Sequence, residues 1–197
     1  MRKLIVAAFI LLSSLACMAQ EAKPVSKLDD MQFRGSYYQI ARLPDKKEKH
    51  CIGNAVEMVA RGDKLNEIDM VDSCKTKGSY ADVRNTKAKR QNKKIDDGRL
   101  KITTFWPLSR RYWVLATAPD YSWFLSGTPN HKNLWIYAKS PALDDAQLNE
   151  IKALATSSGY NLAKLISQPE DATAGQGKLM SGQATGTETG SGQHSLQ

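Results

Sequence analysis

The chain has 197 residues and a formal net charge of +8, from 28 basic and 20 acidic side chains. This length predicts a single folded domain. A basic surface attracts nucleic acid, anionic membranes or anionic ligands. The N-terminus carries features of an export signal, which argue against a nucleic-acid partner.

The first 19 residues predict a secretory signal peptide. Arg2 and Lys3 precede an apolar run at 4–15, which is too short for a transmembrane helix because about 20 apolar residues are needed. Cleavage after Ala19 would release the mature chain. The alternative is a lipoprotein signal in which Cys17 is lipidated. Either reading predicts export to the periplasm or the outer membrane, with a lipid anchor if Cys17 is modified.

Cys51 and Cys74 remain for the folded domain, and an oxidising compartment favours a disulfide between them. They lie 11 residues before Gly62 and 11 residues after Asp63. A hairpin turning at Gly62-Asp63 would bring the two cysteines together. The alternative is a pair of free thiols, in which case His50 and Cys51 would be candidate metal ligands.

The segment from 35 to 139 predicts an antiparallel all-β fold, because short apolar-alternating runs are separated by turn residues. Eight strands can close a small barrel with room for one ligand. Residues 20–34 are predicted to be an extended lead-in, and the barrel domain covers 35–167. The predicted strands are 36–42, 54–60, 64–71, 80–88, 99–105, 111–118, 121–127 and 133–139.

Residues 144–158 change to a helical period, and the predicted helix must pack outside the barrel. Asp144 is the expected N-cap and Gly159 suits the C-terminal end. Residues 161–166 can form a short additional strand. Residues 168–197 predict a disordered tail, because they have too few large apolar side chains to offset the entropy of ordering. The apolar face of the helix comprises Leu148, Ile151, Leu154 and Ala155.

Strand alternation predicts which side chains line the barrel interior. Within 99–105, Arg99 and Lys101 mark the outer face, so Leu100 and Ile102 point inward. By the same reasoning the charged Glu57 is expected to face outward, so Val56 and Met58 are predicted to point inward. Such walls suit an apolar molecule with a polar end, whereas the alternative is a barrel filled by its own side chains. The candidate ligand-binding residues are Val56, Met58, Leu100, Ile102, Tyr112, Val114, Leu125, Trp135 and Tyr137.

Three motifs resemble those of the lipocalin family. Residues 35–42 (GSYYQIAR) resemble the first-strand signature, usually Gly-x-Trp-Tyr-Glu-Ile-Ala-Arg. Residues 119–123 (PDYSW) and 134–141 (LWIYAKSP) resemble the second and third motifs. The resemblance covers about residues 30–166 and is greatest to bacterial outer-membrane lipocalins and their apolipoprotein D-like relatives. It implies an eight-stranded antiparallel up-and-down lipocalin barrel with a C-terminal α-helix packed outside.

Two positions depart from the family pattern. Tyr37 stands where Trp is usual, and Lys139 stands where Arg is usual. In the family these two residues pack as a cation over an aromatic ring at the closed end. Tyr37 and Lys139 are therefore expected to form a weaker plug of the barrel base, since Trp and Arg make the stronger pair.

The resemblance implies binding, storage or transport of a small hydrophobic or amphipathic ligand, such as a fatty acid or lysophospholipid, without a cofactor. On this model Lys46, Lys47 and Lys49 lie near the open end. They would attract an anionic headgroup or an anionic membrane surface, or would serve solubility alone. The sequence does not indicate an oligomeric state.

The sequence contains no HExxH, nucleophile elbow, phosphate loop or spaced Cys/His metal cluster. We therefore predict a non-enzymatic binding protein with neither catalytic nor metal-ligating residues. The alternative is an isomerase- or hydrolase-like enzyme on the same barrel, with Glu67 or Asp69 as an acid or base inside an apolar lumen.

Overall fold

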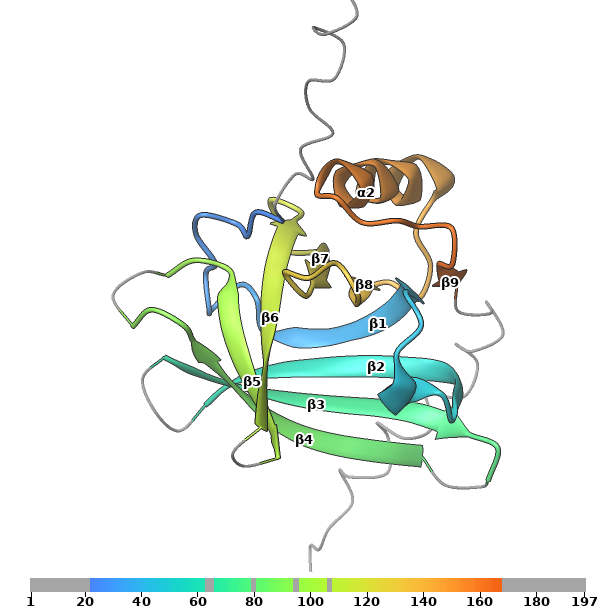
Figure 1. Ribbon diagram of the computed structural model, residues 1–197, viewed down its shortest axis with the longest axis horizontal. Helices are drawn as coiled ribbons and strands as arrows, with labels where there is room; N and C mark the ends of the chain where they lie inside the picture. The colour runs from blue at the N-terminus through green and yellow to red at the C-terminus, as the bar shows by residue number, and fades with distance from the viewer. Residues whose placement is uncertain (1–21, 63–65, 79–80, 94–95, 106–107, 168–197) are drawn as a thin grey trace, which may run out of the picture.

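The computed structural model of the chain describes residues 22–62, 66–78, 81–93, 96–105 and 108–167 (Figure 1). The predicted signal peptide, with Cys17, and the predicted tail at 168–197 lie outside these residues. Among the residues described, no helix is both long and apolar enough to span a membrane.

Eight antiparallel strands form a closed barrel, as the sequence predicts. Each strand pairs with the next along the chain, and β1 pairs with both β8 and β2, which closes the sheet. The third strand is shifted toward the C-terminus relative to the predicted run 64–71. The strands are β1 (Gly35–Arg42), β2 (Cys51–Arg61), β3 (Glu67–Thr76), β4 (Ala81–Arg90), β5 (Arg99–Phe105), β6 (Leu108–Thr117), β7 (Trp123–Gly127) and β8 (Leu134–Ala138).

The helix α2 (Asp145–Ser157) lies outside the barrel near β7 and β8 (Figure 1). The Asp144 carboxylate caps it by accepting a hydrogen bond from the Gln147 backbone N–H at 2.8 Å. Ile151 and Ala155 are fully buried in an outer apolar cluster beneath the helix. The additional strand β9 (Ile166–Ser167) follows and pairs with β1, so only its first residue falls within the predicted run 161–166.

The lead-in closes the base of the barrel instead of running past it. Leu28 and Phe33 are fully buried in the inner apolar cluster. The buried Arg90 guanidinium fixes this segment, donating to the carbonyl oxygens of Leu28 at 2.9 Å and Asp97 at 2.7 Å. These hydrogen bonds replace those that the two carbonyl oxygens would otherwise accept from water.

Aromatic rings fill the lower half of the interior. The Phe124 ring centroid lies 5.0 Å from that of Phe33 and 4.8 Å from those of Tyr37 and Tyr137. The Lys139 ammonium lies 5.5 Å from the Tyr37 ring centroid, so the two departures from the family pattern do contact one another. In the described part of the barrel, space for a ligand therefore lies toward the end opposite this aromatic base.

Candidate ligand-binding site

A small cavity, partly open to solvent, lies at the end of the barrel opposite the aromatic base. The space inside it holds about one water molecule, far less than typical small-molecule sites, which enclose about 300–1,000 Å³. The walls come from β1 to β4, β8 and the loop between β1 and β2. The lining residues are Gln39, Glu48, Cys51, Ala55, Val56, Asp72, Ser73, Cys74, Arg84 and Tyr137.

Six of the nine predicted lumen residues lie in the inner apolar cluster. Of these, Tyr137 also lines the cavity. Val56 is half-buried and borders the cavity, although it shares a strand face with Met58. The six residues of the inner cluster are Leu100, Ile102, Tyr112, Val114, Trp135 and Tyr137.

The predicted inward orientation of Met58 is wrong. Met58 is 47% exposed, whereas Glu57 is 1% exposed and shares the inward face with Ala55 and Val59. The charge on Glu57 was the reason to place it outside. The barrel accepts Glu57 because the Tyr112 hydroxyl donates to its two carboxylate oxygens at 3.3 and 3.4 Å.

The predicted inward orientation of Leu125 is also wrong. Leu125 belongs to the outer cluster beneath α2, and its neighbour Phe124 points into the barrel. Both faces of β7 are apolar and buried. Alternation therefore shows that the two residues oppose one another, but the packing of the helix decides which of them faces outward.

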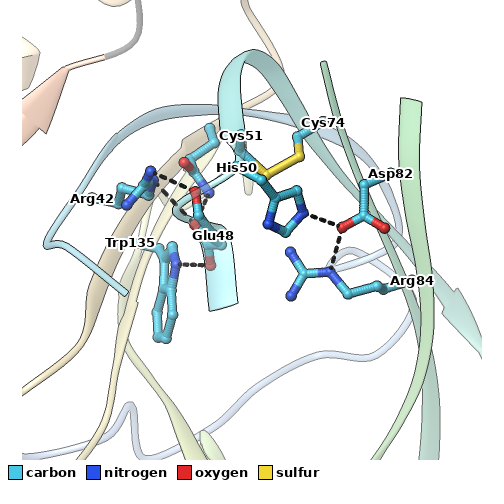
Figure 2. Close-up of a disulfide and its surroundings, with 9 residues drawn as sticks. Arg42, Glu48, His50, Cys51, Cys74, Asp82, Arg84 and Trp135 are labelled. Atoms are coloured by element: carbon cyan, nitrogen blue, oxygen red, sulfur yellow. Dashed lines mark hydrogen bonds and ion pairs between the residues drawn. A yellow bond between two sulfur atoms is a disulfide. The ribbon is translucent and has the colours of Figure 1, made fainter. Parts of the chain in front are cut away.

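The loop between β1 and β2 folds over the mouth of the barrel through Glu48, the last residue of the short 3-10 helix η1 (Lys46–Glu48). Its carboxylate accepts a hydrogen bond from the Trp135 indole N–H at 2.9 Å and pairs with the Arg42 guanidinium at 3.1 Å (Figure 2). Glu48 could not be predicted as a site residue, because no local pattern in the sequence indicates that this loop turns inward.

A second ion pair ties the same loop to β6. Arg110 donates to Asp45 at 2.8 Å, and its guanidinium carbon lies 5.0 Å from the Trp135 ring centroid. Burial acts to raise the pKa of Asp45, but hydrogen bonds from the Lys47 N–H and Arg110, with the arginine charge, lower it overall. The carboxylate is thus held in its charged form.

The predicted disulfide between Cys51 and Cys74 is confirmed, with the Cα atoms 5.5 Å apart. Two register irregularities in β2 shift Cys51 along β3 toward Cys74. The His50 ring lies beside the bridge and contacts the Asp82 carboxylate at 2.7 Å, and Asp82 also pairs with Arg84 at 3.3 Å (Figure 2). Because both sulfur atoms are in the bridge, they are not available as metal ligands.

Two carboxyl groups, that of the fully buried Glu57 and that of the half-buried Asp72, are register partners on β2 and β3 and lie on the inward face. Desolvation, and next the nearby Asp72, raise the pKa of Glu57 well above its usual value. Desolvation raises the pKa of Asp72 to about 6, although Arg84 opposes this rise. The pair therefore tends to retain a proton at mildly acidic pH.

The raised pKa of Asp72 predicts a pH-dependent stability. Below about pH 3 the group is mainly protonated in both states and has little net effect. Between about pH 3 and pH 6 the unfolded state loses its proton first, so stability falls as pH rises. Above pH 6 the whole rise in the pKa of Asp72 is expressed as a loss of stability of about 3 kcal/mol. Asp72→Asn should therefore raise the urea midpoint at pH 8 and leave it nearly unchanged at about pH 3; an equal gain at both pH values would contradict this account.

The acid–base candidates of the enzyme alternative lie on the outer face of β3. Glu67 and Asp69 oppose the inward-facing Ile68 and Met70. Glu67 pairs with Lys89 at 3.4 Å, and Lys87 lies 3.4 Å from Asp69. Neither carboxylate points into an apolar lumen, so the specific basis of that alternative is removed.

The lysines of the mouth loop are exposed, as expected. Lys46 and Lys47 lie on η1, and Lys49 follows it. All three are at the open end, beside the cavity wall formed by Glu48 and Cys51. Their positions agree with either predicted role, attraction of anions or solubility.

The geometry of the described residues defines a class of protein: an eight-stranded antiparallel barrel with one α-helix packed outside and a candidate site near its open end. A family model described as a lipocalin-like domain matches residues 28–170. The chain therefore belongs to the lipocalin family.

Named relatives and solved structures agree with this assignment. The chain is 25% identical over 158 residues to the outer membrane lipoprotein Blc of Vibrio cholerae, covering 80% of this chain and 91% of the relative. It is 24% identical over 162 residues to temperature-induced lipocalin-1 of Arabidopsis thaliana, covering 78% and 86%. The structure of insecticyanin from the tobacco hornworm Manduca sexta aligns with a TM-score of 0.61 at 21% identity, covering 77% and 87%. That structural likeness concerns the fold alone.

Proposed function

We propose that the chain binds and stores or transports one small amphipathic molecule, of the fatty acid or lysophospholipid class, in the cell envelope. The observation that carries this proposal is the cavity at the open end. Its lining combines the aromatic ring of Tyr137 with the polar groups of Gln39, Glu48 and Arg84. Burial of apolar surface drives uptake of the hydrocarbon part of the ligand, and the polar groups of the cavity orient the ligand's polar end.

The family assignment supports the same proposal at a coarser level, namely binding of a hydrophobic ligand in general. The relatives from Vibrio cholerae, Citrobacter freundii and Escherichia coli are named outer membrane lipoproteins. Together with the predicted signal peptide and Cys17, these names support a location in the envelope. Mass spectrometry of the mature N-terminus distinguishes a lipid-bearing Cys17 from a chain that starts after Ala19.

A matched pair of substitutions in β2 tests whether the cavity is the binding site. Ala55 lines the cavity, whereas Ala60 is exposed on the opposite face of the same strand. Ala55→Phe should fill the cavity and weaken the binding of a fluorescent fatty acid or lysolipid at least about tenfold, or about 1.4 kcal/mol. Ala60→Phe should change the affinity less than about twofold.

The titration has two outcomes that would contradict the proposal. One is the absence of saturable binding to the wild-type protein, and the other is equal affinity in both variants. Trp135→Ala, which removes the indole N–H that holds the wall residue Glu48, should also weaken binding. The ligand should be recovered unchanged after incubation; its chemical conversion would instead favour an enzyme.

A further inference from the structure

The mouth loop, residues 44–50, closes the open end of the barrel with the carboxylate of Glu48. Its only apolar residue is Pro44, which is exposed, so the loop buries no apolar side chain of its own. Both ends of the loop are fixed. The Leu43 N–H donates to the Leu134 carbonyl oxygen at 2.9 Å before it, and the disulfide follows it. Between these two anchors the loop is held to the barrel through polar contacts.

Three buried donors approach the Glu48 carboxylate from inside the barrel (Figure 2). The Trp135 indole N–H donates to Oε1 at 2.9 Å, the Gln39 amide donates to Oε2 at 3.5 Å, and Arg42 Nε lies 3.1 Å from Oε2. Gln39 and Arg42 are on β1 and Trp135 is on β8, which pairs with β1. The sheet thus supplies one positive charge and several N–H groups around a single carboxylate, and the loop supplies the carboxylate.

The fit between Arg42 and the carboxylate of the loop is incomplete. Within the described residues, Arg42 Nε has no hydrogen-bond partner, although it lies close to Glu48 and the residue is only 7% exposed. A buried N–H group without a partner is costly, and an acceptor in a better-aligned position removes this cost. A carboxylate on a free ligand is not tied to the backbone of the loop, so it can take such a position.

The cavity beside Glu48 is too small for an amphiphile unless part of its wall moves. It holds about one water molecule, whereas sites for small organic molecules enclose about 300–1,000 Å³. Glu48 is the wall residue carried by the mouth loop. Segments with few buried apolar contacts open at the lowest cost in free energy, so the mouth loop is the part of the wall that yields to an entering ligand.

We propose that Gln39, Arg42 and Trp135 form a carboxylate-binding site, which the chain's own Glu48 occupies until the carboxylate of an amphiphilic ligand displaces it. This inference rests on the proposed function and narrows its ligand to amphiphiles that end in a carboxylate. The exchange conserves charge, because one carboxylate replaces another beside the buried guanidinium. The released Glu48 side chain enters water among the exposed lysines of the mouth loop.

This exchange makes the site selective for charged ligands. If an alcohol displaced Glu48, the Arg42 guanidinium would stay buried without a counter-charge, which is costly. A carboxylate of the same chain length avoids that cost. Glu48 competes with the ligand for the same donors, so the closed state lowers the ligand's apparent affinity in proportion to its population. Removal of the Glu48 charge should therefore strengthen the binding of a carboxylate.

Calorimetric titration of the full chain with decanoate and decanol at pH 8 tests the selectivity and the competition. Decanoate should bind the wild-type protein at least about tenfold more tightly than decanol. Glu48→Gln preserves the size of the side chain but removes its charge, and should strengthen decanoate binding at least about fivefold. The matched control is Glu150→Gln on the exposed side of α2, which should change either affinity less than about twofold.

Removal of the donors should have the opposite effect on decanoate. Arg42→Gln should abolish most of the advantage of decanoate over decanol, because no positive charge then faces the carboxylate. Trp135→Phe retains an aromatic ring without the indole N–H, and should reduce that advantage at least about threefold. Circular dichroism establishes that each variant is folded. If Arg42→Gln does not fold, Trp135→Phe and Glu48→Gln still decide the question.

The outcomes separate this site from the binding function as a whole. If neither ligand binds the wild-type protein, the proposed function fails, and the carboxylate site fails with it. If both ligands bind but decanoate has no advantage, the carboxylate site alone is overturned. Unchanged or weaker decanoate binding in Glu48→Gln would equally overturn it, because that result is expected if Glu48 serves only to hold the loop in place.

Discussion

Replacing Phe124 by alanine should lower the free energy of unfolding by about 4 kcal/mol, within the range of about 3–5 kcal/mol typical of buried phenylalanine. Phe124 is fully buried at the centre of the inner cluster. Its ring contacts Phe33, Tyr37 and Tyr137 edge-on or stacked. These rings come from the lead-in and from strands β1 and β8, so the space left by the missing ring cannot collapse without moving several elements.

Denaturation in urea measures this effect, with Leu108→Ala as the control. Leu108 is 65% exposed, so its truncation should cost less than about 0.5 kcal/mol. The same Phe124 variant has a second expected result, because the aromatic plug limits the depth of the cavity. Its removal should improve binding of longer-chain ligands relative to shorter ones. A cost below about 1 kcal/mol would show that the base of the barrel is not packed as described.

Removing the disulfide should cost about 3.5 kcal/mol. The bridge spans 23 positions in sequence, and the chain-entropy model gives this value for a loop of that size. Converting Cys51 and Cys74 to alanine, or reducing the wild-type protein, should lower the denaturation midpoint by similar amounts. Mass spectrometry should show a gain of two hydrogens on reduction of the wild-type bridge.

The disulfide should also affect binding, because both cysteines line the cavity. The bridge anchors the start of β2, directly after the loop that carries Glu48. Loss of this anchor should weaken binding of the fluorescent ligand at temperatures where the variant is still folded. A bridge-free protein with wild-type stability and affinity would contradict both expectations, and an unchanged mass on reduction would show that the bridge is absent.

Local patterns were sufficient to predict the eight strands, the helix with its Asp144 cap and the pairing of the cysteines. Each depends on residues close in the sequence: a period of two, a period of 3.6, a capping side chain and a turn. The inward orientation of Leu100 and Ile102 was also predictable, because charged neighbours mark the opposite face.

The composition of the binding site depended on tertiary contacts instead. Glu57 faces inward because Tyr112 and Tyr137, which are remote in sequence, offer hydroxyl groups across the barrel. Glu48 reaches Trp135 only because the loop after β1 folds over the mouth.

The packing at the base of the barrel could not be predicted from local sequence patterns either. The lead-in is predominantly polar, yet Leu28 and Phe33 enter the base, where Arg90 supplies donors for its backbone. On β7 both faces are apolar, so the position of α2 decides between Phe124 and Leu125. Alternation determines which residues oppose one another, whereas the partner that satisfies a buried polar group, or covers an apolar face, comes from another part of the chain.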